Sequence, residues 1–237
     1  MRVLRGRGHS PEADREHTAA LLASAGDGTP GLRVWTPHRQ VAFGRRDARE
    51  PGFERAKRVA TDRGFTPIER DVGGRAVAYP GDTVAFAHAI PLGDDRDRGL
   101  IAERYERATE TVIEALRRLG ADVSRGEPPE SFCPGDHSVR VAGGGKVAGI
   151  AQRVRGDAAL VAGCLVVTRG DARDIADVTA GVYGAIDVPF DPETVGSVAD
   201  AGGPDRPKPV ARTLEEAFVD DPWGDGDPQI DRIDRDD

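Results

Sequence analysis

A chain of 237 residues is long enough to bury one substantial hydrophobic core, so a single domain of catalytic size is the simplest organisation. Its formal net charge of -8 argues against non-specific binding to nucleic acid or to an anionic membrane, because both bind proteins with clustered positive charge. We therefore expect neither nucleic acid nor membrane as a partner.

Lysine is almost absent from the chain, whereas arginine is plentiful. Lys57, Lys146 and Lys208 are the only lysines, and aspartate clearly outnumbers glutamate. This bias is typical of a halophile, in which a carboxylate-rich surface stays hydrated in high salt. No apolar run approaches the roughly 20 residues that cross a bilayer, and the N-terminus lacks the apolar core of a signal peptide. We expect a cytoplasmic protein whose two cysteines are free thiols.

Helices and short strands alternate in the first part of the chain. A first helix over residues 12–25 follows Ser10 as its N-cap, and a second over residues 50–64 ends at Gly64. Turn residues separate short runs rich in β-branched and aromatic side chains. These runs predict strands at 32–36 and 40–44 and three more, joined by turns, within 65–91.

The longest predicted helix, residues 99–121, ends at Gly120 and carries apolar residues along one face. These residues are Ile101, Tyr105, Ala108, Val112, Ala115, Leu116 and Leu119. The later elements are a hairpin at 139–153, a buried strand at 159–168, a helix at 171–184, a Pro-rich connection at 186–200 and a helix at 212–221.

Strands that follow one another through tight turns, interrupted by single helices, predict an α+β fold. We expect a mixed, mostly antiparallel sheet with helices packed on one side, and not a doubly wound parallel sheet. The catalytic domain should occupy residues 1–219. Residues 220–237 are acidic and rich in Gly and Pro, so they predict a disordered tail.

The segment RDVGGRAVAYPGD, residues 70–82, places two adjacent glycines between predicted strands, with Arg70 and Arg75 on either side. Glycine lets the backbone pass close to a ligand or take a positive φ angle. Such a loop can lie along an acyl chain or bind a phosphate through its N–H groups. A plain hairpin turn is the alternative interpretation.

The segment SFCPGDHSVRVAGGGKVAGIAQR, residues 131–153, contains both a loop cysteine, Cys133, and one of the rare lysines, Lys146. Lys146 begins the return strand of the predicted hairpin, where small neighbours such as Gly149 leave room for a ligand. A lysine there can donate hydrogen bonds to a carbonyl oxygen, although a solvated turn lysine is the plainer alternative. If Cys133 lies near the ammonium, its thiolate becomes a competent nucleophile that His137 could assist as a base. Cys164, within an apolar strand, is interpreted as a packed core thiol.

With these segments in view, the chain resembles the biotin/lipoate protein ligase superfamily, in its lipoate ligase and octanoyltransferase branch. The resemblance is carried by FGRRDARE, ERDVGGRAVAYPGDTVAFAHAIP, GGGKVAGIAQRVRGDAALVAGCLVV and VPFDPETVGSV. It extends from about residue 12 to about residue 219. The glycine-pair segment and the lysine segment together are specific to this branch.

The resemblance implies an enzyme that joins an octanoyl or lipoyl group in amide linkage to a lysine of a lipoyl carrier domain, either the glycine cleavage H protein or a 2-oxoacid dehydrogenase E2. SFCPGDHSV is similar to the cysteine loop of octanoyl amidotransferases, which implies that Cys133 is the nucleophile and forms a thioester. Lys146 matches the family lysine that contacts the acyl carbonyl. The substrate-binding residues implied are Arg70, Val72, Gly73, Gly74, Arg75, Ala76, Val77, His137 and Gly149.

Two alternatives remain open at this point. In an ATP-dependent lipoate–protein ligase, Cys133 would be incidental and the arginine loop with Lys146 would handle a lipoyl-adenylate. Adenylating members usually show Asn-Asp where this chain has His137 and Ser138, which disfavours that reading. The second alternative is a non-catalytic acyl- or carrier-binding subunit that needs a separate accessory subunit. We expect no tightly bound cofactor and no metal site, with ATP and Mg required only by the ligase. A tyrosine and proline replace the family's histidine at residues 79 and 80, so the acyl pocket is expected to differ.

Overall fold

The computed structural model describes residues 1–70, 74–93, 98–221 and 228–233. Within these residues eight strands form one mixed sheet in the order β11-β1-β2-β6-β10-β9-β8-β7. β1 pairs in parallel with both β2 and β11, and the other neighbours are antiparallel. The strands are β1 Arg2–Arg5, β2 Gly31–Trp35, β6 Val84–Pro91, β7 Val123–Arg125, β8 Ser138–Val141, β9 Lys146–Arg155, β10 Ala158–Leu165 and β11 Gln229–Arg232.

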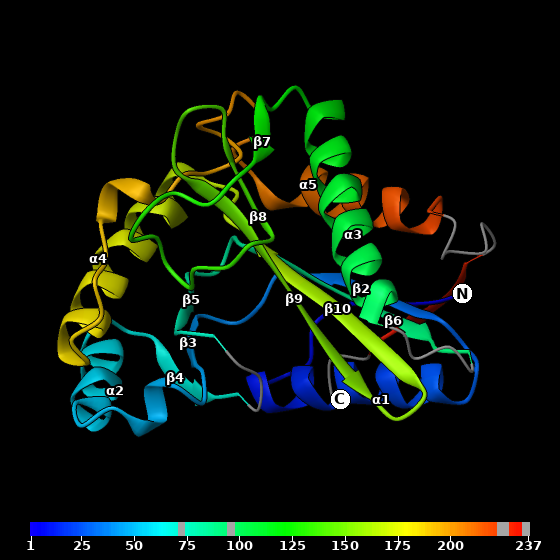
Figure 1. Cartoon of the computed structure of the whole chain (residues 1–237), viewed down its shortest axis with the longest axis horizontal. Helices are drawn as coiled ribbons and strands as arrows, with labels where there is room; N and C mark the ends of the chain where they lie inside the picture. Colours follow the sequence, from blue (N-terminus) through cyan, green and yellow to red (C-terminus); the bar gives the residue numbers. More distant parts are fainter. Residues whose placement is uncertain (71–73, 94–97, 222–227, 234–237) are drawn as a thin grey trace.

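A second, smaller sheet has the order β4-β3-β5 and lies beside the large one with α2 and α4 (Figure 1). Its central strand, β3, is parallel to β4 and antiparallel to β5. Its strands are β3 Gln40–Phe43, β4 Thr66–Glu69 and β5 Val77–Tyr79. The α-helices of the described chain are α1 Pro11–Gly26, α2 Phe53–Asp62, α3 Arg98–Arg118, α4 Arg169–Ala185 and α5 Pro207–Val219, with short 3-10 turns at Asp47–Arg49 and Pro192–Thr194.

Several predicted helix signals have the expected geometry. The Ser10 side chain accepts a hydrogen bond from the Ala13 N–H and so caps α1, and Pro11 stands at the first turn. Gly64 and Gly120, the predicted helix stops, have φ angles of +74° and +84°. Glycine adopts this left-handed region without the strain that a side chain would add.

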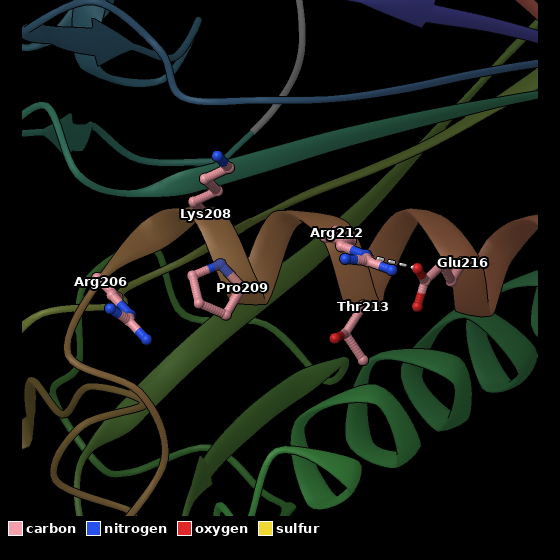
Figure 2. A pocket seen from close by; sticks show the side chains of 6 residues that line it. All are labelled: Arg206, Lys208, Pro209, Arg212, Thr213 and Glu216. Carbon is pink, nitrogen blue, oxygen red and sulfur yellow. Dashed lines mark hydrogen bonds and ion pairs between the residues drawn. The ribbon is translucent and has the colours of Figure 1, made fainter.

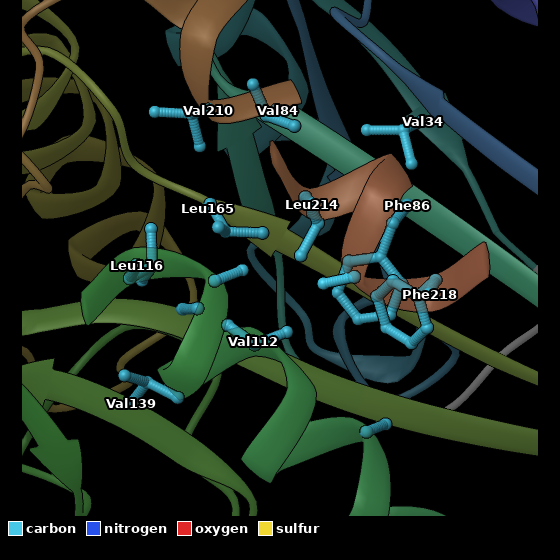
Figure 3. Close-up of a cluster of buried hydrophobic side chains, with 14 of the residues drawn as sticks. Val34, Val84, Phe86, Val112, Leu116, Val139, Leu165, Val210, Leu214 and Phe218 are labelled. Atoms are coloured by element: carbon cyan, nitrogen blue, oxygen red, sulfur yellow. The ribbon is translucent and has the colours of Figure 1, made fainter. Parts of the chain in front are cut away.

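The hydrophobic core lies on the face of the large sheet that α3 and α5 cover. Figure 3 shows Val112 and Leu116 from α3, Leu214 and Phe218 from α5 and Phe86 of β6 in one cluster of buried side chains, with Phe218 beside Phe86. The opposite face carries a separate cluster, in which α1 packs Leu21 and Leu22 against Ala89 and other strand residues. Helices therefore cover both faces of the sheet, and the prediction that they pack on one side is wrong. β6 explains the difference, because its side chains are buried on both faces along almost its whole length.

The glycine-pair segment is not a hairpin turn. In the described residues β4 and β5 lie on either side of β3 and pair with it, and not with each other. The predicted strands at 32–36 and 40–44 likewise belong to different sheets, as β2 and β3. Local turn signals predict the strands themselves but do not report which strand a segment will pair with.

Three short strands and one surface residue depart from the sequence predictions. β1, β7 and β11 were not predicted, and β11 extends the large sheet beside β1, so residues 229–232 are ordered although they belong to the predicted disordered tail. Ile101, predicted on the buried face of α3, is 37% exposed at the N-terminal end of that helix. Among the described residues, no helix combines the length and apolar character needed to cross a membrane.

Candidate active site

The candidate active site lies where the small sheet meets the β8–β9 hairpin of the large one. The loop that carries Cys133 joins β7 to β8, Lys146 is the first residue of β9, and the glycine-pair segment leads into β5. α4 passes behind this loop and contributes Tyr183. Segments far apart in the sequence therefore converge on Cys133.

Lys146 is fully buried, and all the hydrogens of its ammonium are engaged. Its Nζ donates to the carbonyl oxygens of Phe132 at 3.0 Å and Cys133 at 2.9 Å. It also contacts both carboxylate oxygens of Glu127, at 3.0 and 3.2 Å. Glu127 accepts a further hydrogen bond from the Ser131 hydroxyl. Lys146 thus fastens the backbone on the carbonyl side of Cys133, a role that the sequence did not indicate.

Cys133 has an unusual backbone conformation for a residue with a side chain. Its φ angle is +42°, in the left-handed region, and its side chain is partly exposed. Its N–H donates to the Tyr183 hydroxyl at 2.8 Å. Because the Cys133 carbonyl lies 2.9 Å from Nζ of Lys146, covalent geometry places the sulfur within about 8 Å of that ammonium. The nucleophile candidate and the rare lysine are therefore neighbours.

Arg70 lies beside the sulfur. Its Nη2 donates to the Arg75 carbonyl at 2.8 Å and lies 3.6 Å from Sγ of Cys133. Burial of the guanidinium lowers its pKa, but the charges of Cys133 and Tyr79, when ionised, outweigh that effect and the pKa of Arg70 is raised. Arg70 is therefore a fixed cation beside the Cys133 sulfur.

Two glycines make room for this contact. A side-chain carbon on Gly74, whose φ is +94°, would lie 3.0 Å from the Cys133 sulfur and 3.1 Å from Nη2 of Arg70. A side-chain carbon on Gly44, after β3, would lie only 2.1 Å from the Gly74 carbonyl oxygen. The Gly44 and Gly74 backbones are therefore in direct contact, and the sulfur occupies the space over Gly74.

Arg75 faces away from Cys133 and belongs to a structural cluster. Its Nη1 contacts the carboxylates of Glu50 at 2.8 Å and Asp47 at 3.3 Å. Asp47 is fully buried and accepts the Gly44 N–H at 2.8 Å. Burial raises the pKa of Asp47, although its hydrogen bonds from Gly44 and Arg75 oppose the shift. This cluster shapes the turn after β3 and supports the glycine-pair segment from behind.

The other predicted substrate-binding residues lie in three different places. Ala76 is buried, and its carbonyl accepts the Tyr183 hydroxyl at 3.0 Å, while Val77 is buried in β5. Gly149 lies beside Lys146, because a side-chain carbon there would be 3.4 Å from Cε of the lysine. Val72 and Gly73 lie outside the described residues.

His137 is placed against α3. Its ring stacks on Tyr105 with the ring centroids 3.9 Å apart and the planes 7° from parallel. Within the described residues its Nδ1 is buried without a hydrogen-bond partner, so that nitrogen does not contact the Cys133 sulfur. The structure brings Arg70, Gly74 and Lys146 to Cys133 but gives His137 a different neighbour.

Cys164 lies on β10, in a row of small residues on the face of the sheet opposite α3 and α5. It stands between Gly149 of β9 and Ala85 of β6, and the next such row contains Ala151, Ala162 and Ala87. Directly opposed residues of antiparallel strands share a face, so these residues form a shallow floor that starts at Lys146. Desolvation, with a smaller contribution from Asp171, raises the pKa of Cys164 to about 12. Its thiol is therefore protonated at neutral pH.

Tyr183 and Glu127 are site residues that sequence reasoning missed. Tyr183 lies within a helical segment whose pattern is explained by packing alone, and it is 50 residues from Cys133. Glu127 lies in a Pro-rich loop with no recognisable motif. Glu127 becomes recognisable only once Lys146 is known to be buried. A buried ammonium requires a carboxylate or several hydrogen-bond acceptors around it.

A separate pocket lies on the surface of α5, outside this site. Figure 2 shows Lys208 directed away from the ion pair of Arg212 with Glu216, whose closest atoms are 2.8 Å apart. Lys208 is exposed, so it has the ordinary environment that Lys146 lacks. The pocket is lined by Arg206, Lys208, Pro209, Arg212, Thr213 and Glu216.

The amino-acid sequence of this chain is similar to those of known proteins. A family model described as the lipoyl protein ligase A/B catalytic domain matches residues 12–205. The octanoyl-[GcvH]:protein N-octanoyltransferase of Bacillus velezensis is 35% identical over 144 residues, which are 59% of this chain and 49% of that protein. A protein of the same name from Oceanobacillus iheyensis is 26% identical over 215 residues, 85% of this chain and 75% of its own length. The chain spans about half the length of the first of these relatives.

Solved structures of lipoate ligases share the fold. Lipoate-protein ligase A bound with ATP superposes with a TM-score of 0.75 at 23% identity, covering 99% of this chain and 90% of that one. A bi-partite lipoate protein ligase from Thermoplasma acidophilum, studied with its E2 lipoyl domain, gives a TM-score of 0.68 at 21% identity, covering 99% and 88%. The predicted α+β lipoate ligase architecture is confirmed.

Proposed function

Because the chain belongs to the lipoyl protein ligase A/B catalytic domain family, we propose that it is a cysteine-dependent transferase of octanoyl groups between lipoyl carriers. The single observation that carries the proposal is the position of the Cys133 sulfur, on a partly exposed residue and 3.6 Å from the Arg70 guanidinium. The names of the relatives, which describe octanoyl transfer from the H protein to another protein, support the same reaction.

The first step forms an acyl-enzyme. The Cys133 thiolate, stabilised by Arg70, attacks the carbonyl carbon of the octanoyl amide on the donor carrier. A carbon–sulfur bond forms, the carbon–nitrogen bond of the amide breaks, and the donor lysine takes up a proton as it leaves. The product is an octanoyl thioester on Cys133.

The second step transfers the acyl group to the acceptor. The neutral amine of an acceptor lysine attacks the thioester carbonyl, the new carbon–nitrogen bond forms, and the carbon–sulfur bond breaks. The acceptor nitrogen releases one proton, and the thiolate returns to its place beside Arg70. The two steps together consume no ATP, because the thioester keeps the acyl group activated.

Lys146 has two proposed roles in the reaction, holding the Cys133 loop in place and supplying positive charge. Its contacts with Phe132 and Cys133 hold the backbone of the nucleophile, and its ammonium adds positive potential where the acyl oxygen becomes negative. Lys146 can donate a hydrogen bond to that oxygen only if it gives up its contact with Glu127. The Glu127 side chain is 23% exposed, so the acyl oxygen can take its place beside the ammonium.

The acyl chain would lie on the floor of small residues that starts at Gly149. Glycine, alanine and cysteine side chains leave the sheet surface open, and Gly149, Cys164 and Ala162 are each partly exposed. A medium-length hydrocarbon chain fits such an apolar floor, whereas its carbonyl needs the charged groups at one end. Lys146 and Arg70 supply those charges.

A transfer assay with defined carriers tests the proposal. Purified protein in high salt is mixed with an octanoylated H protein as donor and an E2 lipoyl domain as acceptor, and acceptor mass and pyrophosphate are measured. We expect the acceptor to gain one octanoyl group without nucleotide and without pyrophosphate release. Modification only with free lipoate and ATP, accompanied by pyrophosphate, would assign the ligase instead. Binding without turnover until a second protein is added would indicate a subunit.

A further inference from the structure

Tyr183 connects the nucleophile loop to the glycine-pair segment. Its side chain is fully buried on α4. Its hydroxyl accepts the Cys133 N–H at 2.8 Å and donates to the Ala76 carbonyl at 3.0 Å. One oxygen atom therefore joins two loops that lie more than 50 residues apart in the sequence.

The conformation of Cys133 needs such a contact. A left-handed φ of +42° is unfavourable for a residue with a side chain, and it persists only where surrounding structure holds it. Lys146 binds the carbonyl of Cys133 and Tyr183 binds its N–H, so both flanking peptide groups are fixed. Rotation of either peptide would move the sulfur away from the space over Gly74 and from Arg70.

We propose that Tyr183 is a positioning residue for acyl transfer, which sets the Cys133 sulfur in register with Arg70 and the acyl-binding segment. This inference rests on the proposed function, since it concerns the same nucleophile. Burial raises the pKa of Tyr183, with the nearby Cys133 contributing, so the hydroxyl stays protonated. It therefore acts as a neutral hydrogen-bonding link and takes no part in proton transfer.

The ring and the hydroxyl of Tyr183 can be separated experimentally. The ring belongs to a buried hydrophobic cluster and meets Phe190 edge-on, with ring centroids 5.6 Å apart. Tyr183→Phe keeps that packing and removes only the link. Tyr105→Phe is the matched control, because the Tyr105 hydroxyl also accepts a backbone N–H, from Gln152 at 2.9 Å, and the variant keeps the ring that stacks on His137.

The test combines two measurements on both variants and the wild type. The first is the pH profile of Cys133 alkylation by iodoacetamide, resolved by peptide mass spectrometry so that Cys164 is counted separately. The second is the single-turnover rate of acyl-enzyme formation at saturating octanoylated H protein, together with the half-saturating concentration. Thermal unfolding of each protein reports any general loss of stability.

For Tyr183→Phe we expect slower alkylation of Cys133 than in the wild type across the profile, because the sulfur leaves Arg70. The acylation rate should fall by up to about 100-fold with little change in half-saturation, since a misplaced group affects the chemical step more than binding. Tyr105→Phe should match the wild type in both. A Tyr183→Phe variant that matches the wild type in profile and rate would overturn the inference. If the wild type forms no acyl-enzyme, the proposed function fails, while the alkylation profile still decides whether Tyr183 positions the sulfur.

Discussion

Cys133 and Cys164 are the two thiols of this chain, and their surroundings give them opposite chemistry. Cys164 is held in a central strand between two neighbours, and desolvation raises its pKa to about 12. Cys133 lies in an irregular loop, with a left-handed backbone and a guanidinium 3.6 Å from its sulfur. Both residues are partly exposed, so exposure does not distinguish them. The proposed nucleophile therefore differs from Cys164 in its neighbouring cation and its constrained loop, and not in its exposure class.

Removing Lys146, which holds the Cys133 loop, should have the largest effect on the difference between the two cysteines. Lys146→Ala leaves Glu127 without its partner and frees the Phe132 and Cys133 carbonyls. We expect the acylation rate to fall by at least about 100-fold and the free energy of unfolding to decrease by about 3 kcal/mol, as for other broken buried pairs. Transfer assays and denaturant unfolding measure the two effects. Lys208→Ala, at an exposed lysine, is the control. An equal loss of acylation rate and stability in that variant would contradict the specific role of Lys146.

Filling the space between Gly74 and the Cys133 sulfur should make Cys133 a poorer nucleophile without removing a charge. Gly74→Ala forces a methyl group to within 3.0 Å of Sγ of Cys133 at a φ of +94°. Gly64→Ala is a matched control, because its φ is +74° but nothing lies within 4 Å of the added carbon. Both should be destabilised by about 1 kcal/mol through backbone strain. Only Gly74→Ala should also reduce Cys133 acylation, by about 100-fold for a displacement near 1 Å. Equal activity in the two variants would contradict the assigned contact.

Removing the positive charge of Arg70 tests whether that charge distinguishes Cys133 from Cys164. Arg70→Gln keeps a polar side chain but deletes the charge beside Sγ. Alkylation of Cys133 at neutral pH should slow, because the variant lacks the cation that lies 3.6 Å from Sγ. Arg63→Gln, at an exposed arginine paired with Asp177, should have no effect. Unchanged alkylation in Arg70→Gln would remove Arg70 from the account.

The smallest effects concern Cys164. With a pKa of about 12, its thiol should resist iodoacetamide at pH values where Cys133 reacts, and should react only after unfolding. The folded state favours the protonated thiol, so its contribution to stability is present below the unfolded value near 9 and is lost as pH rises above it. Cys164→Ala should therefore flatten the alkaline loss of stability slightly and leave transfer unchanged. Denaturant unfolding between pH 8 and 11 checks the slope. Rapid alkylation of Cys164 in the folded protein would contradict the assignment.

Local sequence signals predicted most helices and strands, but not which of them lie side by side. The helix with Ser10 at its start and the hairpin whose return strand begins at Lys146 follow from capping and turn chemistry, and both are observed. The pairing of β3 with β4 and β5 depends on contacts distant in sequence, so the glycine-pair loop was interpreted as a possible hairpin. Tyr183 was missed for the same reason. A tyrosine on a buried helix face has no local feature that reports a hydrogen bond to a distant loop.

Arg75 and His137 show that the sequence does not give the direction of a side chain. Sequence placed both near the substrate because they lie close to the motif residues along the chain. In the structure Arg75 is committed to Glu50 and Asp47, and His137 to Tyr105. Side-chain direction decides these assignments, and it depends on neighbours that the motif does not contain.

The most direct test of the account is the intact mass of the protein after incubation with octanoylated H protein in high salt, without ATP. We predict one octanoyl adduct, removed by hydroxylamine, on the wild type and on Cys164→Ser, and no adduct on Cys133→Ser. An adduct that persists on Cys133→Ser, or a wild-type protein that stays unmodified while the acceptor is acylated, would contradict the Cys133 thioester.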